Sequence, residues 1–279
     1  MNLPMWQPSE DQIKRSNMTA FMAEIEDSWG VQIFDSDALH KFSITEREKF
    51  WSSIIRFASI QAETWGDKVL VDGNKMPGAT WFPEARLNYA ENMLTLPDGI
   101  SSTSEAIVFK SENGFESRLT FRQINEKVSI LAQALSSKGI KSGDRVAGYL
   151  PNIPETIIAM LAANTLGAIW SSCSPDFGVQ GVLDRFGQIE PKILFSIDGY
   201  YYNGKYHDSL SKTADIISKL PSLQKTIIIP YGKTQPNNFN VSKLANAILI
   251  DEFTAPFSPN QILFQQLSFN HPLYILFSS

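Results

Sequence analysis

The sequence predicts an α/β fold in which a parallel sheet carries helices on both faces and follows a helical amino-terminal segment. Short apolar runs alternate with helical patterns between residues 145 and 197, the connections are short, and residues 1–65 show helical periodicity. Strands that alternate with helices favour a parallel sheet with right-handed crossovers. We place residues 1–104 in the helical and irregular segment and residues 105–279 in the α/β part.

The amino-terminal segment carries patterns typical of helix starts. Ser9 with Gln12, and Ser43 with Glu46, fit the capping box, in which two side chains satisfy free backbone N–H groups. The later stretch Trp81–Leu94 places two large aromatics before a short amphipathic helix. Because aromatic side chains supply large buried areas, an anchoring role is favoured over direct contact with a ligand.

A hairpin and a long helix open the α/β part. Asn113-Gly114 stands between two extended runs and is a strong two-residue turn signal. Thr120 with Gln123 forms another capping box, and the apolar spacing that follows predicts a helix as far as Gly139.

The next block begins the predicted parallel sheet. Arg145–Leu150 has the short apolar composition of a buried strand and stops at Pro151. Asn152 with Glu155 then predicts the start of a helix. Gly167 suits the left-handed position that follows a helix end, so the helix is expected to stop there.

A second strand, helix and strand follow in the same manner. Ala168–Ser172 is an apolar run, and Asp176 is predicted to cap the helix after it. Proline disfavours helical geometry in the residue before it, so Glu190-Pro191 is expected to end that helix. Lys192–Ile197 is the third strand.

The remaining elements are predicted from the same patterns. They are a tyrosine-rich loop over Asp198–Lys205, a helix over 208–219, a strand over Thr226–Ile229, a polar loop over 231–243 and a final strand over Leu273–Phe277. The last run follows Pro272, contains no breaker, and is expected to join the same sheet as Arg145–Leu150.

Composition restricts the class of protein. The 279-residue chain has a net charge of −5, 43% hydrophobic residues and a mean hydropathy of −0.13, which fits a globular protein and gives no electrostatic reason to bind nucleic acid. No apolar run approaches the roughly 20 residues that span a bilayer. The first residues lack the layout of a signal peptide, and a single cysteine fits a reducing cytoplasm.

Few residues indicate chemistry by themselves. His40, His207 and His271 have no second ligand at metal-binding spacing, so no metal site is predicted and no catalytic residue is assigned. Cys173 lies at a strand end without a partner histidine, which favours a buried, inert thiol. The chain has neither the dinucleotide-binding nor the P-loop glycine pattern, which disfavours a dehydrogenase.

Three stretches together resemble the adenylate-forming acyl-CoA synthetases. Trp81–Leu94 is similar to the amino-terminal region of acetyl-CoA-synthetase-type enzymes, and Arg145–Phe195 to the first sheet of acyl-CoA ligases. The motifs SSCSPDFG at Ser171–Gly178 and DGYYYNGK at Asp198–Lys205 are most similar to the acetoacetate–CoA ligases. The resemblance runs from about Trp6 to the last residue.

The resemblance implies a reaction and a truncated chain. The family joins a carboxylate, here acetoacetate, to CoA with ATP, through an acyl-adenylate, and releases AMP and pyrophosphate. Its phosphate loop resembles [YF]-[ST]-S-G-[ST]-T-G-x-P-K, and this sequence stops at Phe277-Ser278-Ser279. Ser278 and Ser279 are therefore expected to begin the ATP-phosphate loop. ATP, Mg²⁺ and CoA belong to the full-length family, and an inactive fragment with no bound cofactor is expected.

The resemblance also implies part of a CoA surface. Pro175, Asp176 and Phe177 stand where acetyl-CoA synthetases carry Gly-Gly-Phe, and Tyr202 and Lys205 replace two arginines near the CoA nucleotide. A lysine meets a phosphate as a point charge, and a tyrosine stacks on adenine. The alternative for these residues is a loop filled by packed tyrosines.

Two other functions remain open from the sequence. One is a fragment of a different short-chain acyl-CoA synthetase, and the other is a non-catalytic interaction module of the same fold. Coding DNA that continued in frame beyond Ser279 as the phosphate loop would favour a ligase.

Uncovered apolar surface near Leu273–Phe277 also predicts self-association.

Overall fold

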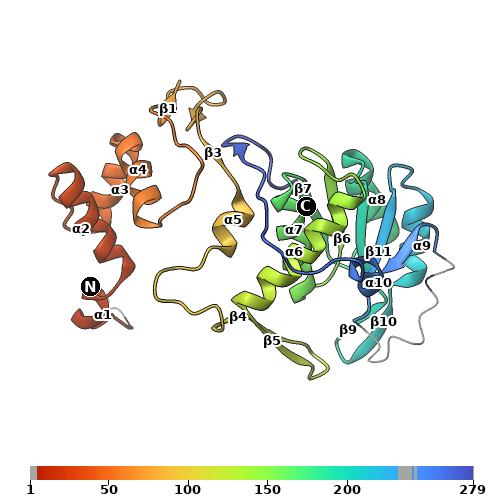
Figure 1. The fold of residues 1–279 in the computed structure, drawn as a ribbon. Helices are drawn as coiled ribbons and strands as arrows, with labels where there is room; N and C mark the ends of the chain where they lie inside the picture. The colour runs from red at the N-terminus through yellow and green to blue at the C-terminus, as the bar shows by residue number, and fades with distance from the viewer. Residues whose placement is uncertain (1–4, 232–240, 242–243, 279) are drawn as a thin grey trace. The chain divides into compact units, whose positions relative to one another are not determined.

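The computed structural model describes residues 5–231, 241 and 244–278, and the chain divides into two compact units (Figure 1). The first unit comprises Met1–Arg86 with Ser268–Asn270, and the second comprises Leu87–Leu267 with His271–Ser279. Within the described residues, no helix is long and apolar enough to cross a membrane.

The first unit is mainly helical. Its elements are α1 (Glu10–Lys14), α2 (Asn17–Trp29), α3 (Ser36–Thr45), α4 (Arg47–Phe57), β1 (Leu70–Val71) and β2 (Thr80–Trp81), and β3 (Arg86–Leu87) and β13 (Leu267–Ser268) lie at the unit boundaries. Phe21 and Ile25 of α2 are buried against Leu39 and Phe42 of α3, which gives this unit a core of its own.

One of the two predicted capping boxes in this unit is confirmed. Ser9 and Gln12 bond each other's backbone N–H groups at the start of α1. The second, Ser43 with Glu46, is wrong, because Asp35 caps α3 and this helix continues through Ser43. Glu46 then precedes α4 without a side-chain cap.

The second unit holds the predicted α/β fold. Its other elements are α5 (Tyr89–Leu94), β4 (Glu105–Lys110), β5 (Glu116–Thr120), α6 (Phe121–Ser137), β6 (Arg145–Tyr149), α7 (Pro154–Thr165), β7 (Ile169–Cys173), α8 (Val179–Ile189), β8 (Ile193–Ile197), β9 (Gly199–Tyr202), β10 (Lys205–Asp208), α9 (Leu210–Ser218), β11 (Lys225–Ile229), β12 (Ala247–Leu249) and α10 (Ile250–Thr254). β4 and β5 form the predicted hairpin, and Thr120 with Gln123 caps α6.

Five parallel strands form the central sheet in the order β12-β11-β8-β6-β7. The chain passes from β6 to β7 on one side, and then crosses back to β8 on the other side of β6. Ligands of such sheets bind beyond the carboxyl ends of the strands, where the direction of winding changes. The loops after β6, β7 and β8 are therefore the first place to look for a site.

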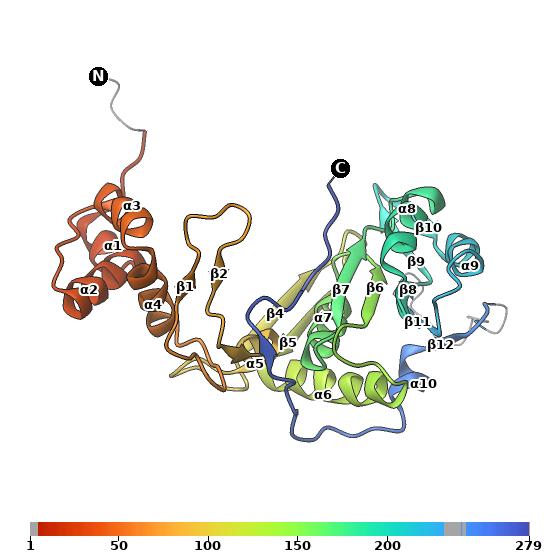
Figure 2. The ribbon, with the colours of Figure 1, turned by 90° about the horizontal axis from the view of Figure 1, so that it is seen from above.

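Helices cover both faces of this sheet, as predicted (Figure 2). Side chains alternate along a strand, so neighbours in β6 enter different cores. Val146 joins the core under α6 and α7, whereas Ala147 and Tyr149 join the core under α8 and α9. The sheet is thus buried on both sides, which accounts for the nearly continuous apolar sequence of its strands.

Two predicted helix caps are wrong. Asn152 does not cap α7, because Pro154 occupies its first turn and Ile153 stands at the cap position without a side-chain bond. Pro154 has no N–H to satisfy, so this start needs one donor fewer. Asp176 does not cap α8 either, since Gly178 holds that position and no side chain caps it.

The run Leu273–Phe277 lies beside β7 at the sheet edge but does not form a full strand. It makes one parallel bridge, between Tyr274 and Trp170. The Trp170 N–H donates to the Leu273 carbonyl at 3.1 Å, and the Ile275 N–H donates to the Trp170 carbonyl at 2.9 Å. The run therefore joins the predicted sheet, but it pairs through a single β-bridge and is not the regular strand that was predicted.

Candidate functional site

The loop after β7 is held in place by the hydroxyl of Tyr149, the last residue of β6. This hydroxyl lies 2.9 Å from the carbonyl oxygen of Pro175 and 2.7 Å from that of Phe177, so its single proton serves either acceptor. Burial raises the pKa of Tyr149 to about 12, with the Asp176 charge as a smaller cause. The hydroxyl therefore remains protonated, and remains a donor, at neutral pH.

Asp176 is bonded from two sides. The Tyr200 hydroxyl donates to one carboxylate oxygen at 2.7 Å, and the Ser174 hydroxyl lies 2.9 Å from the other. Burial, and then the bond to Asp176, raise the pKa of Tyr200. These bonds explain why Asp176 does not cap the following helix, since its oxygens already accept from other groups.

A hairpin replaces the predicted tyrosine-rich loop. β9 and β10 pair in antiparallel register around Asn203 and Gly204, whose φ values are +51° and +71°. Positive φ at both positions is the type I′ geometry that Asn-Gly favours. This dipeptide was the sequence signal for the hairpin, and the three tyrosines before it obscured that signal.

The register places four side chains on one face of this hairpin. Lys205 lies opposite Tyr202, and His207 lies opposite Tyr200, and residues two apart along a strand share a face. The rings of Tyr200 and His207 stack with centroids 5.1 Å apart and 21° between planes. We call this surface, made by Tyr200, Tyr202, Lys205 and His207, the hairpin face.

The two ends of the hairpin face differ in exposure. Tyr200 is only 7% exposed and holds Asp176, whereas Tyr202 is 61% exposed. At the turn, the Gly204 N–H donates to the carboxylate of Glu112 at 2.8 Å, which connects this hairpin to the β4–β5 hairpin. The structure thus brings the Pro175–Phe177 loop to Tyr200, and within the described residues no hydrogen bond or ring contact joins this loop to Tyr202 or Lys205.

Two basic side chains beside the loop were missed by the sequence analysis. The guanidinium carbon of Arg185, in α8, lies 4.3 Å from the ring centroid of Phe177. The ammonium of Lys212, in α9, lies 3.4 Å from the Pro175 carbonyl oxygen. Arg185 lies in the helix that directly follows the loop, whereas α8, β8, β9 and β10 separate Lys212 from the loop in the sequence. The packing of α9 brings Lys212 to the loop.

Ser278 is exposed and comes directly after Phe277, and Ser279 lies outside the described residues. The Phe277 ring centroid is 5.9 Å from the guanidinium carbon of Arg185. Because the run before it is parallel to β7, Ser278 lies toward the carboxyl edge of the sheet.

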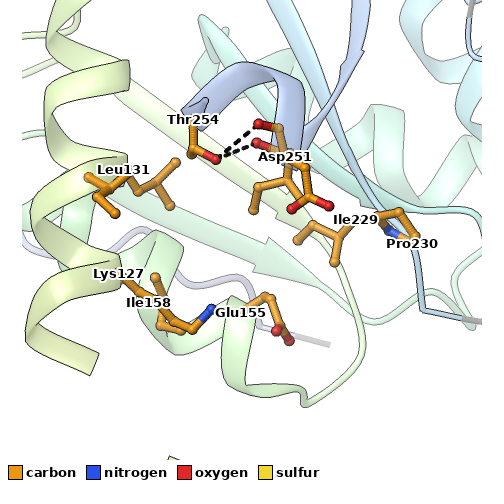
Figure 3. Close-up of a pocket in the computed structure, with 10 residues that line it drawn as sticks. Lys127, Leu131, Glu155, Ile158, Ile229, Pro230, Asp251 and Thr254 are labelled. Carbon is orange, nitrogen blue, oxygen red and sulfur yellow. Dashed lines mark hydrogen bonds between the residues drawn. The ribbon is translucent and has the colours of Figure 1, made fainter. Parts of the chain in front are cut away.

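Apart from this loop, a pocket opens at the carboxyl end of β11 (Figure 3). It has a volume of about 300 Å³ and lies between α6, α7 and α10. Its floor is aliphatic, and Lys127, Glu155 and Asp251 bring charge to its walls. None of the residues expected from the sequence to bind a ligand lines this pocket.

The remaining candidate residues show no metal site. No group of three or more histidine, cysteine or acidic side chains that could hold an ion occurs in the described part of the chain. His271 contacts the Gly167 carbonyl through Nε2 at 2.8 Å, which is a structural role. Cys173 is buried, as predicted, and burial raises the pKa of its thiol.

Removal of the Tyr149 hydroxyl should loosen the loop. Tyr149→Phe removes the hydroxyl donor from the Phe177 carbonyl and leaves the Pro175 carbonyl with only the longer contacts to Lys212 and Tyr200. We therefore expect a loss of about 1–2 kcal/mol in the free energy of unfolding and faster amide exchange at residues 176–178. Tyr201→Phe is the matched control, since the Tyr201 hydroxyl makes no hydrogen bond within the described residues. Equal urea midpoints and equal exchange for the two variants would contradict this role.

Comparisons with known proteins identify the family of the chain. The model of the AMP-binding enzyme family matches residues 100–279, and that of the acetyl-coenzyme A synthetase amino terminus matches residues 36–93. The first match covers well over half of the chain, and the chain therefore belongs to the AMP-binding enzyme family.

Within the family, the chain is similar to acetoacetyl-CoA synthetases. It is 43% identical over 276 residues to that of Rhizobium meliloti and 39% identical over 282 residues to that of Macaca fascicularis. The solved acetoacetyl-CoA synthetase from Streptomyces lividans matches with a TM-score of 0.90 and 36% identity. Each match covers 99% of this chain and 41% of the relative, so the chain spans about two fifths of the relatives' length.

Proposed function

We propose that this chain forms the amino-terminal part of an ATP-dependent acetoacetate–CoA ligase. A carboxylate oxygen of acetoacetate attacks the α-phosphorus of ATP and pyrophosphate leaves. The CoA thiolate then attacks the acyl carbon of the adenylate, and AMP leaves with the electron pair of the broken C–O bond. The observation that carries the proposal is the likeness of 99% of the chain to acetoacetyl-CoA synthetases, at 43% identity and a TM-score of 0.90.

In this proposal the chain supplies part of the CoA surface. Pro175, Asp176 and Phe177 form the loop on which the nucleotide of CoA rests, and the hairpin face lies next to it through Tyr200. Tyr202 offers a largely exposed ring for stacking on adenine, and Lys205, directly opposite, offers a positive charge for a phosphate.

The chain also supplies the beginning of the ATP-phosphate loop. Ser278 is exposed at the carboxyl edge, and its hydroxyl is assigned to a phosphate oxygen together with that of Ser279.

ATP, Mg²⁺ and CoA act in the complete enzyme. That enzyme works in the cytoplasm, in the metabolism of acetoacetate as a lipid-derived ketone body. Self-association through Tyr274 and Leu276, which is 80% exposed, is part of the proposal, as is a domain boundary at residue 104.

A second candidate is a ligase for another short acid. A malonamoyl-CoA synthetase of Penicillium aethiopicum is 35% identical over 272 residues and is covered to a similar share, 38% of its length. Acetoacetate and malonamate are both short acids with a second carbonyl group at the same position. The identities of 43% against 35% favour acetoacetate.

The test is ATP–pyrophosphate exchange, which reports adenylation without CoA. A polypeptide of residues 1–279 should give exchange no faster than a no-enzyme control, because preorganised phosphate donors are usually the largest catalytic contribution and most of the family's length is not in it. The same residues joined to the remaining three fifths of the Rhizobium meliloti relative should restore exchange with acetoacetate. A folded hybrid that exchanged with malonamate and not with acetoacetate would select the second candidate.

A further inference from the structure

Arg185 and Lys212 approach the loop after β7 from two helices that pack together, α8 and α9. Arg185 lies over the Phe177 ring, 4.3 Å from its centroid, and Lys212 lies 3.4 Å from the Pro175 carbonyl oxygen. The two cations thus contact positions two residues apart in one short loop.

Neither cation is neutralised by a carboxylate. Within the described residues no ion pair involves Arg185 or Lys212, and the protein bonds found for them are to the Gly181 carbonyl at 2.9 Å and the Pro175 carbonyl at 3.4 Å. A guanidinium has five N–H donors and an ammonium has three, so several donors of both groups remain available. Carbonyl oxygens use only part of that capacity.

The one carboxylate in the loop, that of Asp176, forms no ion pair with either cation in the described part of the chain. The oxygens of Asp176 accept from Tyr200 and Ser174, and neither bonds to Arg185 or Lys212. Lys205 adds a further positive charge on the neighbouring hairpin face. The loop therefore combines an exposed aromatic ring, Phe177, with an excess of positive charge at a carboxyl edge of the sheet.

We infer that Arg185 and Lys212 form a phosphate subsite at the Ser174–Gly178 loop, which receives a phosphate group of the CoA nucleotide. The inference rests on the proposed function and assigns to it two residues outside the motifs that the resemblance identified. Lys212 binds as a point charge, and Arg185, whose guanidinium carbon lies 4.3 Å from the Phe177 ring centroid, offers the planar set of N–H donors that suits a phosphate. Together they replace positive charge that is absent where Tyr202 stands in place of an arginine.

The experiment uses calorimetry to measure binding of CoA, dephospho-CoA and pantetheine to the hybrid of residues 1–279 with the remaining three fifths of the Rhizobium meliloti relative. Lys212→Gln and Arg185→Gln should each weaken CoA binding about tenfold, the size of one lost charge-assisted hydrogen bond. Lys219→Gln is the matched control, because Lys219 follows the same helix at an exposed position and, in the described part of the chain, its side chain makes no hydrogen bond or ion pair with the loop. Arg185→Lys should recover part of the affinity, and pantetheine, which lacks phosphates, should bind all variants equally.

Dephospho-CoA identifies the phosphate. If the variants lose affinity for CoA but not for dephospho-CoA, the 3′-phosphate occupies the subsite; if they lose both equally, the diphosphate does. Variants with wild-type affinity for CoA and native unfolding midpoints would overturn the subsite and leave the ligase proposal intact. If the hybrid without substitutions bound no CoA, the subsite and the CoA surface would both be wrong, whereas ATP–pyrophosphate exchange by the same hybrid, which needs no CoA, would still test the ligase.

Discussion

Replacing Asn88 by aspartate should destabilise the α/β unit by about 3–5 kcal/mol, because it places an uncompensated charge in a buried site. Asn88 is 1% exposed and its amide nitrogen donates to the carbonyls of Asn164, at 3.0 Å, and Gln265, at 2.8 Å. Its side-chain oxygen accepts from the N–H groups of Ala90 and Glu91 at the start of α5. A carboxylate keeps the second pair of bonds but sets negative charge against two carbonyl oxygens.

Urea unfolding followed by circular dichroism measures this effect. The matched control is Asn113→Asp, in the exposed turn between β4 and β5, where the side-chain oxygen only accepts, from Ser111 and from the Phe115 N–H. Aspartate preserves both acceptor bonds, so the change should stay within about 0.5 kcal/mol. Equal midpoints for the Asn88 and Asn113 variants would show that the amide donors of Asn88 contribute nothing.

Gly148→Ala should cost about 1–3 kcal/mol of stability, the usual result of inserting a methyl group into a well-packed core. Gly148 lies in the middle of β6, and an added Cβ would stand 2.7 Å from Cζ2 of Trp170 and 3.2 Å from Cδ1 of Leu150. Trp170 is 1% exposed, so its ring has no space into which it can move.

The same substitution at Gly187 should have the opposite sign. Gly187 lies inside α8, where an added Cβ has no neighbour within 4 Å. Alanine is favoured over glycine in a helix interior, so Gly187→Ala is expected to raise the free energy of unfolding by about 0.5–1 kcal/mol. Urea unfolding of the two variants measures both changes in the free energy of unfolding. A stabilising Gly148→Ala would contradict the close packing of the Trp170 ring against Gly148.

The sequence was sufficient for features that depend on local pattern. The strands of the sheet are short apolar runs bounded by proline and glycine, and the Thr120–Gln123 box marks the start of α6 with residues three apart. Helices on both faces followed from the alternation of strand and helix. These features need no knowledge of which distant residues meet.

The candidate site depends on distant contacts, and there the sequence was a weaker guide. Asp176 had the residue type of a helix cap, but Tyr200, 24 positions later, takes its oxygen. The motif positions Pro175 and Phe177 were identified by resemblance. Arg185 meets Phe177 from the next helix, α8, whereas Lys212 reaches Pro175 because α9 packs on the same face of the sheet as α8. The local propensity of a residue for helix or strand carries no information about such tertiary contacts.

The bond between the Gly204 N–H and Glu112 has a mechanical consequence. A hairpin that leaves a sheet is supported at its base, and its turn is normally the end with the largest amplitude of motion. Here the Gly204 N–H in the turn donates to Glu112 of the β4–β5 hairpin at 2.8 Å. The segment that carries Tyr202 and Lys205 is therefore held both at its base and at its turn. The stiffness of that surface is therefore set partly by Glu112, a residue in a different loop, and evolution can adjust it without changing any side chain on the hairpin face.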